Sequence, residues 1–403
     1  MIRWGYRRAF LCCVLLFLLG TLIQLVSGPV PKQLLHYPWS LILALVYVYA
    51  LILIDSLSGK YPRLRRLSDP YASFASITSV VLLSVIFGLI PQSETASGPA
   101  AALGWTDMRR CWAFNFLMLW MMTGIGLSVV SGFRQLKSRR LVSTLSHLAV
   151  FLVLLGGFFG NGDKQEVYVT AERDIPVSSG VDDADQAVEL PFMLTLLDFT
   201  IEEYPASLRL TDPETGRFAP GSVPAETVGE KAAIGDWTLE ILEFHDMAAR
   251  MPEDSVYTEL KHVGACPAAR VRATRGDEIR EGWVSCGSFL FEEAQLDLGE
   301  GVAVKMPRRM PKRYLSDVQL RSEKKGEQRV EIAVNHPARL GPWTIYQYDY
   351  DMTRGRWSNQ SGLLCVKDGW YPLIAAGLWL LLGAGVLMFF TAGGSRKKKE
   401  DKR

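Results

Sequence analysis

The sequence predicts a polytopic α-helical membrane protein with one large, mainly antiparallel β domain outside the bilayer. Apolar residues make up 49% of the 403 residues, and they concentrate in six long uncharged runs. Each run approaches or exceeds the roughly 18 to 20 residues that a helix needs to cross the hydrocarbon core. A polar segment of about two hundred residues, rich in Asp, Glu, Arg and Gly, separates the fifth run from the sixth. We therefore expect six transmembrane helices and a soluble domain before the last one.

The runs divide the chain into four parts. The six runs are Ala9–Ser27, Tyr37–Ile54, Tyr71–Gln92, Cys111–Phe133, Leu141–Gly160 and Trp370–Thr391. The parts are an N-terminal hairpin with a cytoplasmic loop (1–70), helices three to five (71–160), the β-rich domain (161–368), and the last helix with a basic tail (369–403). The apolar stretch of the first run is long for a signal peptide, so we expect it to be retained.

Basic residues indicate the orientation of these helices. Every second loop or tail carries a Lys/Arg cluster, and such clusters favour the cytoplasmic side of a membrane. The clustered residues are Arg3, Arg7, Arg8, Lys60, Arg63, Arg65, Arg66, Arg134, Lys137, Arg139, Arg140 and the tail from Arg396 to Arg403. The alternate short loops carry only Lys32, Arg109 and Arg110. We expect a multi-pass protein of the cytoplasmic (inner) membrane, with both termini cytoplasmic and the large domain extracytoplasmic, facing the periplasm.

The residue pattern of the polar segment predicts β-strands. "DWTLEIL" alternates apolar Trp237, Leu239 and Ile241 with polar residues, as in a half-buried strand. "PFMLTLLDFTIEEY" (Pro191–Tyr204), "ARVRATRGDEIREGWVSC" and "RVEIAV" (Arg329–Val334) have similar patterns, and Gly- and Pro-rich breaks separate them. An antiparallel sandwich or open barrel is the expected architecture.

Two cysteines flank a predicted hairpin turn in "ATRGDEI". A three-residue loop, Arg275-Gly276-Asp277, would place Cys266 directly opposite Cys286, where a disulfide is feasible. A two-residue loop would shift the register by one and put them on opposite faces. Both registers remain open from the sequence. Cys365 would be a spare thiol.

His147 is the one histidine of five that lies inside an apolar run, in "TLSHLAVFLVLLGGFFG" (Thr144–Gly160). Six residues beyond Leu141, at about 1.5 Å each, place it roughly 9 Å into the helix. An ionisable group at this depth usually faces a bundle interior or a cavity with a partner. One reading is a neutral imidazole bonded to Ser143 or to a facing helix. The others are an axial ligand of a buried haem, for which neutral imidazole is a usual donor, or a proton relay.

A second candidate region is "VNHPARLGPWTIYQYDYD" (Val334–Asp351). Asn335-His336-Pro337 predicts a strand that ends in a sharp turn. Tyr346, Tyr348 and Tyr350 are spaced by two, so we expect them to share one face of a strand. That face is either an aromatic core or interface surface, or a platform for a flat hydrophobic ligand.

The remaining histidines are weaker candidates. His336 is a candidate outer haem ligand. His36 is predicted to lie at the membrane interface, with an outer haem ligand as the alternative, and His245 and His262 are predicted on the surface. The chain contains no C-x-x-C-H and therefore no c-type haem attachment site of its own. Phosphate-loop, zincin and nucleophile-elbow motifs are also absent, and no catalytic residue is proposed. The lipid bilayer is an expected partner, and a nucleic acid is not.

Several of these motifs together resemble the ResB (CcsB) family of system II (Ccs) cytochrome c biogenesis proteins. The resemblance rests on "LSHLAVFLVLLGGFFG" leading into "LPFMLTLLDFTIEEY", on "VNHPARLGPWTIYQYDYD", and on "SGLLCVKDGWYPLIAAGLWLLLGAGVLMFF". The third run, which ends in "IFGLIPQ", is similar to the usual first helix of the family. The resemblance to the family covers about Pro70 to Phe390. The family core has four membrane helices, so the hairpin Ala9–Ile54 is an addition to it.

The resemblance implies a role and a set of partners. Such a chain is one subunit of a cytochrome c synthetase (haem lyase) complex, in a non-catalytic or co-catalytic part. Its partner would be a CcsA-type membrane protein with a tryptophan-rich haem segment. Haem b would be a transient substrate that is presented to apocytochrome c, which a thioredoxin-like protein keeps reduced. His147 matches the family's intramembrane histidine and is thereby implied as a ligand of the haem iron.

Two other functions remain in view. One is a membrane electron-transfer subunit with a permanent haem b, which usually needs two facing intramembrane histidines, whereas this chain has one. The other is a scaffold that recruits partners through its β domain without binding a cofactor.

Overall fold

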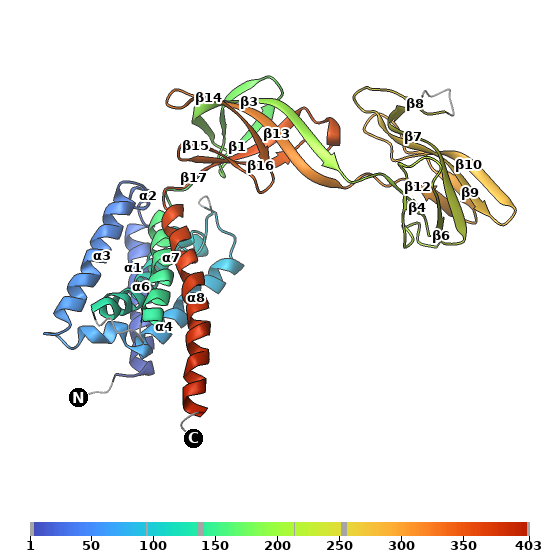
Figure 1. Ribbon diagram of the computed structural model, residues 1–403. Helices are drawn as coiled ribbons and strands as arrows, with labels where there is room; N and C mark the ends of the chain where they lie inside the picture. The colour runs from blue at the N-terminus through green and yellow to red at the C-terminus, as the bar shows by residue number, and fades with distance from the viewer. Residues whose placement is uncertain (1–3, 94–95, 135–140, 213, 251–255, 401–403) are drawn as a thin grey trace. The chain divides into compact units, whose positions relative to one another are not determined.

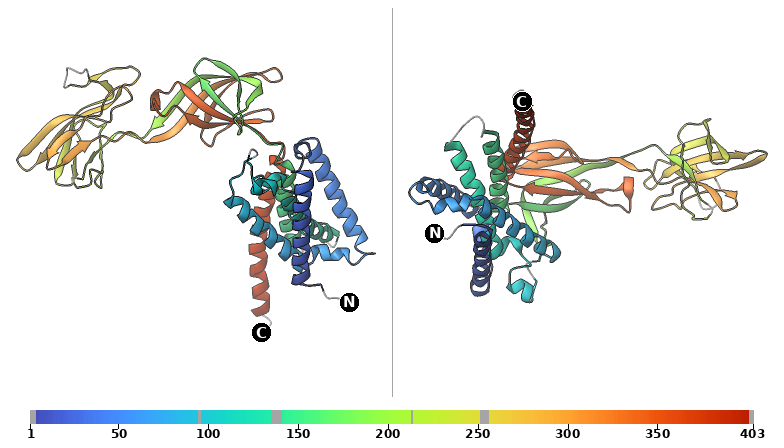
Figure 2. Two further views of the ribbon diagram at one scale, coloured as in Figure 1. Left: turned by 180° about the vertical axis from the view of Figure 1, so that it is seen from behind. Right: turned by 90° about the horizontal axis from the view of Figure 1, so that it is seen from below.

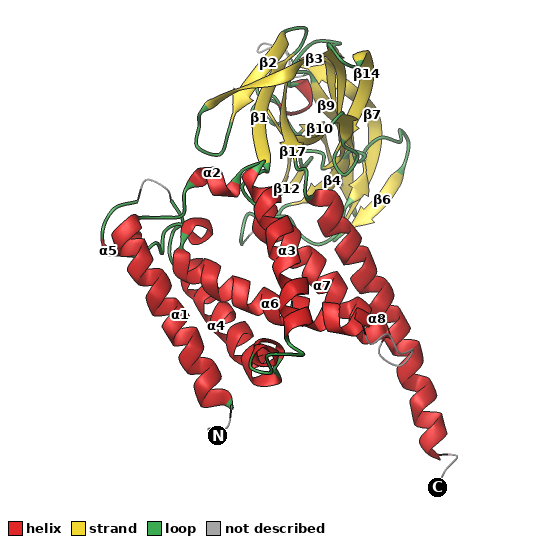
Figure 3. Ribbon diagram, turned by 90° about the vertical axis from the view of Figure 1, so that its left-hand side faces the viewer, coloured by secondary structure: helices red, strands yellow, loops and turns green. Residues whose placement is uncertain are grey.

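The computed structural model describes residues 4–93, 96–134, 141–212, 214–250 and 256–400. The chain divides into two compact units, a helical one of Met1–Lys164 with Asp368–Arg403 and a β one of Gln165–Lys367. Figure 3 shows the helices and the strands as separate groups, and along the sequence the strands β1 to β17 lie between α7 and α8. Of the basic residues used for orientation, Arg3, Lys137, Arg139, Arg140 and 401–403 lie outside the described residues.

Among the described residues of the helical unit, six helices are long and apolar enough to cross a bilayer, which confirms the predicted number. The long helices are α1 (Tyr6–Ser27), α3 (Trp39–Leu57), α4 (Pro70–Leu89), α6 (Trp112–Arg134), α7 (Leu141–Gly160) and α8 (Tyr371–Glu400). Two short helices, α2 (Lys32–Leu35) and α5 (Pro99–Ala102), lie in the connections. Helix α1 begins and α8 ends at the same end of the bundle, as an even number of crossings requires (Figure 1).

Small residues allow the helices to approach closely. Helix α7 packs on α8 at Gly156, where an added Cβ would lie 2.7 Å from Cγ1 of Ile374, and Gly160 packs on Trp370, which directly precedes α8. Gly377 of α8 lies against the backbone of α7 at Ala149. Close approach through glycine is a common way to associate helices in lipid, where the hydrophobic effect gives no drive.

The described residues of the β unit form three antiparallel sheets. Its strands are β1 (Gln165–Glu172), β2 (Pro176–Val181), β3 (Ala187–Glu203), β4 (Ser207–Leu210), β5 (Val223–Pro224), β6 (Lys231–Ile234), β7 (Trp237–Ala249), β8 (Thr258–Glu259), β9 (Cys266–Arg275), β10 (Glu278–Ser285), β11 (Leu296–Gly299), β12 (Val302–Lys305), β13 (Pro311–Ser322), β14 (Gly326–Ala333), β15 (Ala338–Leu340), β16 (Trp343–Tyr350) and β17 (Gln360–Lys367). The first sheet has the order β14-β13-β3-β2-β1-β17-β16-β15. Its end strands β14 and β15 are joined by a short turn, which curls the sheet into a near-barrel.

The two smaller sheets are inserted in sequence between β3 and β13. One has the order β10-β9-β7-β6 with β8 on β7, and the other has β11-β12-β4-β5. The inserted strands surround their own core, which contains Trp237, Leu239 and Ile241, and the near-barrel has a separate core around Leu194, Leu196 and Ile345. Figure 2 shows the long strands β3 and β13 running side by side between the two sets of strands. The predicted alternation in "DWTLEIL" and in "PFMLTLLDFT" is confirmed by the burial of these residues.

The expectation that Tyr346, Tyr348 and Tyr350 share one face is wrong. A β-bulge interrupts the pairing of β16 with β17 between Gln347 and Asp349, and the extra residue reverses the alternation beyond it. Tyr346 and Tyr348 are exposed, whereas Tyr350 stacks on Phe199 in the barrel, with ring centroids 5.5 Å apart. The three tyrosines therefore form no continuous platform.

The hairpin between β9 and β10 has the two-residue loop. Arg275 pairs with Glu278 across the turn, and Cys266 and Cys286 are both free thiols. The prediction that this register separates the two cysteines onto opposite faces is wrong, because both are buried in the same core cluster. The reason is that Cys286 lies beyond Ser285, the last paired residue of β10, where the alternation no longer applies.

The glycine contact between α7 and α8 gives a first prediction. In Gly160→Ala the new Cβ would lie 2.5 Å from Cβ of Trp370, a position that no side-chain rotation relieves. Overpacking of this kind costs about 1–3 kcal/mol, so the unfolding temperature in detergent should fall by several degrees. Gly157→Ala is the matched control, because nothing lies within 4 Å of its added Cβ. Equal unfolding temperatures for the two variants would contradict this packing.

Candidate functional site

His147 lies on an exposed face of α7, and its ring is fixed by its own helix. Nδ1 is 2.7 Å from the backbone carbonyl oxygen of Ser143. Because a carbonyl oxygen can only accept, Nδ1 carries the proton in this contact, and Nε2 of the neutral ring keeps its lone pair. An imidazole oriented through one nitrogen and open at the other is the usual form of a metal-ligating histidine.

The face of α7 that carries His147 is left open by its neighbours. Helix α7 packs against both α6 and α8. Ala149, Gly156 and Gly160 are buried toward α8, and on another side Thr144 packs on Gly132 of α6. His147 is exposed between these contacts, together with Ser143 and Gly157. Polar or small residues along one exposed face of a membrane helix suit close contact with a further helix.

The carboxylate of Asp163 fixes the C-terminal end of α7. Its Oδ1 accepts from the backbone N–H of Tyr37 at 2.5 Å, and its Oδ2 accepts from the Ser40 hydroxyl at 2.6 Å. Oδ2 also accepts from Nε1 of Trp370 at 2.7 Å. One side chain therefore joins the segment after α7 to the starts of α3 and α8. No pattern in the sequence pairs these residues, although an acidic residue directly after an apolar run is a visible signal.

The other histidines occupy separate places. His336 is exposed in the turn after β14, where its backbone pairs with Ala333, so the predicted sharp turn is confirmed. His36 is exposed at the end of α2. His262 is exposed, and His245 of β7 is partly buried, stacked on Trp283 with ring centroids 5.8 Å apart. In the described part of the chain, no group of three or more His, Cys, Asp or Glu side chains forms a metal site.

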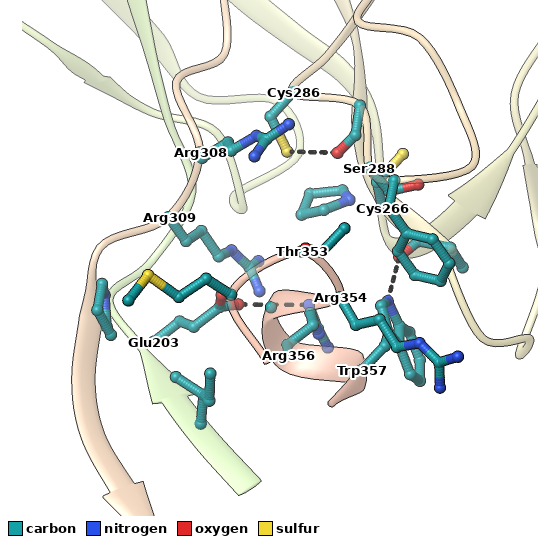
Figure 4. A pocket seen from close by; sticks show the side chains of 18 of the residues that line it. Glu203, Cys266, Cys286, Ser288, Arg308, Arg309, Thr353, Arg354, Arg356 and Trp357 are labelled. Carbon is teal, nitrogen blue, oxygen red and sulfur yellow. Dashed lines mark hydrogen bonds and ion pairs between the residues drawn. The ribbon is translucent and has the colours of Figure 1, made fainter. Parts of the chain in front are cut away.

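The β unit contains a pocket where the ends of β3, β9 and β10 meet the loop after β16. It is a cavity of about 200 Å³. Figure 4 shows its arginines, with Arg308 beside Cys286 and with Arg309 and Arg356 reaching inward from different segments. The pocket is closed on one side by the 3₁₀ turn Gly355–Trp357, which is held because Nε1 of Trp357 donates to the carbonyl oxygen of Ala265 at 3.1 Å.

Carboxylates hold two of these arginines in place. Arg309 pairs with Asp246 at 2.6 Å and with Glu226 at 2.7 Å, and Arg356 pairs more loosely with Glu203 at 3.5 Å. Burial raises the pKa of Glu203, and the two arginines only partly offset this effect. Burial also acts to raise the pKa of Asp246, but its contacts with both arginines outweigh burial and lower that pKa.

Residues 290–364 match the model of the ResB-like family. This match confirms the resemblance to the ResB family that the sequence motifs indicated. The matched segment runs from the loop before β11 into β17 and contains His336, Arg308, Arg309 and Arg356. The match connects the chain with cytochrome c biogenesis in the broad sense. No match was found among the curated proteins.

The thiols of the β unit should be unreactive in the folded protein. Burial raises the pKa of Cys286 to about 11 and that of Cys365 to about 12. A thiol with a pKa near 11 carries roughly 100-fold less thiolate at pH 8 than one with a pKa near 9, and the thiolate is the reactive form. Iodoacetamide labelling of these two residues at pH 8, followed by mass spectrometry, should therefore be slow in the native protein and fast in urea. Equal rates in both states would contradict the buried positions.

Loss of the Asp163 carboxylate should loosen the helical unit. In Asp163→Ala three donors lose their acceptor, and hydrogen bonds to a charged group contribute about 1.5–3 kcal/mol each. We expect a lower unfolding temperature in detergent and a smaller effect for Ser40→Ala, which removes one of the three bonds. The control is Asn161→Ala, at an exposed position two residues earlier. An Asp163→Ala protein as stable as the control would refute the role of this contact.

Proposed function

We propose that the chain is a subunit of a system II cytochrome c synthetase complex and handles haem b as a transient substrate. In this role it carries haem across the cytoplasmic membrane and helps to present it to apocytochrome c for covalent attachment. The observation that carries the proposal is the geometry of His147 in a chain with a ResB-like segment: the imidazole is held through Nδ1 while Nε2 stays open. The chain acts in a non-catalytic or co-catalytic part.

The iron site is shared between two chains in this proposal. His147 is the only histidine in the six membrane-spanning helices, and it is exposed on α7 rather than enclosed by the bundle. A haem iron bound by Nε2 therefore takes its other axial ligand from a second protein that docks on this face. Burial of the imidazole beneath that partner would also remove the cost of a polar group facing lipid. We propose a CcsA-type membrane protein with a tryptophan-rich haem segment as this partner.

The arrangement around the membrane follows from the same role. We propose that both termini are cytoplasmic and that the β unit is extracytoplasmic, as the basic loops favour. Apocytochrome c would meet the complex on that outer side, with its cysteines kept reduced by a thioredoxin-like protein. Cys266 and Cys286 do not serve as that reductant here, because their thiols are buried and burial raises the pKa of both. His336 supplies no iron ligand in this scheme.

The proposal predicts the behaviour of His147→Ala. Co-expressed with the partner, the variant should lose at least ~10-fold in haem content, because losing even an outer partner of a metal ligand commonly costs that much. Covalent cytochrome c should fall in parallel, measured by haem staining of total protein. His262→Ala, at an exposed turn of the β unit, is the matched control and should retain both signals.

The same experiment separates the other two functions. A permanent haem b subunit would retain stoichiometric haem through turnover, whereas a transient carrier shows substoichiometric haem that apocytochrome c depletes. A scaffold would mature cytochrome c normally without His147. Unchanged maturation in His147→Ala would therefore overturn the haem-ligand role.

A further inference from the structure

The arginine pocket of the β unit combines two features that belong together in a ligand site. Four arginines line it, Arg308, Arg309, Arg354 and Arg356, against one carboxylate, Glu203. The acidic groups that pair with Arg309 and with Arg354 lie outside the lining, at Asp246, Glu226 and Asp351. Three of the four arginines are thus paired with carboxylates, and Arg308 is the lining arginine that has no such pair in the described part of the chain. The single acidic group within the lining accepts a proton more readily than usual, because burial raises its pKa.

Some hydrogen-bond donors of the arginines in the pocket have no acceptor within the described part of the protein. Arg309 is nearly buried, with 11% of its side chain exposed, and its Nε has no hydrogen-bond partner in the described part of the chain. Arg308 makes no ion pair with any described residue. A buried guanidinium N–H without an acceptor is costly, so a ligand that supplies acceptors is stabilised there.

Apolar side chains surround these donors. Phe289 and Met352 line the pocket with exposed fractions of 37% and 72%, and Ile201 and Trp357 add further apolar surface. Exposed large apolar residues at the edge of a pocket mark a surface that receives an apolar body. A cavity of about 200 Å³ is smaller than the roughly 300–1,000 Å³ of sites that enclose a whole ligand. It therefore admits one edge of a larger molecule.

We infer that this pocket binds the carboxylate edge of a flat, apolar dicarboxylate, namely the propionates of haem. Guanidinium groups bind carboxylates through paired N–H donors, and the apolar side chains contact the adjoining part of the macrocycle. The inference rests on the proposed function for the identity of the ligand, but it involves neither the iron nor His147. The pocket would hold haem by its acidic edge in the β unit and leave both faces of the iron free for other ligands.

The test uses a porphyrin without iron, so that no histidine ligation contributes. Protoporphyrin IX is titrated into the full chain in lipid nanodiscs, with empty nanodiscs subtracted, and its fluorescence reports binding. Protoporphyrin IX dimethyl ester is titrated in parallel, because it has the same ring but no carboxylates. The wild-type chain should bind the free acid and bind the ester at least ~10-fold more weakly, as the loss of charged hydrogen bonds predicts.

Arg308→Gln is the decisive variant, because removing Arg308 leaves no described carboxylate unpaired. It should weaken binding of the free acid at least ~10-fold and leave binding of the ester unchanged. The matched control is Arg313→Gln, whose arginine pairs with Glu331 at 3.2 Å and does not line the pocket. Equal affinities for acid and ester, or for the two variants, would overturn the inference.

His147→Ala separates this inference from the proposed function. It should retain wild-type affinity for the iron-free porphyrin while it loses haem during co-expression. If Arg308→Gln binds protoporphyrin IX with wild-type affinity and His147→Ala still loses haem, the pocket does not bind the propionates and the proposed function stands. If His147→Ala matures cytochrome c normally while Arg308→Gln loses affinity for protoporphyrin IX, His147 is not a haem ligand, and the inference about the pocket stands.

Discussion

The carboxylate of Asp163 is the contact on which the arrangement of the helical unit depends. It follows α7 directly and accepts three hydrogen bonds, from the backbone of Tyr37, the hydroxyl of Ser40 and the indole of Trp370. Helices α3, α7 and α8 are thereby fixed at one end. Because hydrocarbon gives helices no hydrophobic reason to associate, such polar contacts at the helix ends and glycine contacts along their length must hold the bundle together.

This constraint also fixes the position of His147. With Gly156 and Gly160 against α8 and with Thr144 against α6, α7 has no freedom to turn His147 into the bundle. The imidazole therefore lies on the open side, and its Nδ1 bond to Ser143 gives it a fixed tautomer. The same packing that stabilises the unit leaves an ionisable group at its surface. An ionisable side chain on an exposed face of a membrane helix does not stabilise the fold, so its presence there indicates a function.

The sequence predicted the elements of the fold better than their register. Length and apolarity of the six runs were sufficient for the membrane helices, since crossing a bilayer imposes both. Alternation was sufficient for strands such as β7. It failed at Tyr350, where a bulge shifts the pairing, and at Cys286, which lies just past the paired strand, because neither irregularity leaves a local signature. Asp163 and the arginine pocket were missed because they join residues far apart in the chain.

The central claim is that His147 supplies one axial ligand of a haem whose other ligand comes from a second chain. Isotopic labelling tests it directly. This chain is labelled with ¹⁵N-histidine, combined with an unlabelled membrane partner and haem, and the low-spin ferric complex is examined by pulsed electron–nuclear resonance. The account predicts one ¹⁵N and one ¹⁴N axial nitrogen, with the ¹⁵N signal lost in His147→Ala. Two ¹⁴N nitrogens, or two ¹⁵N nitrogens, would contradict it.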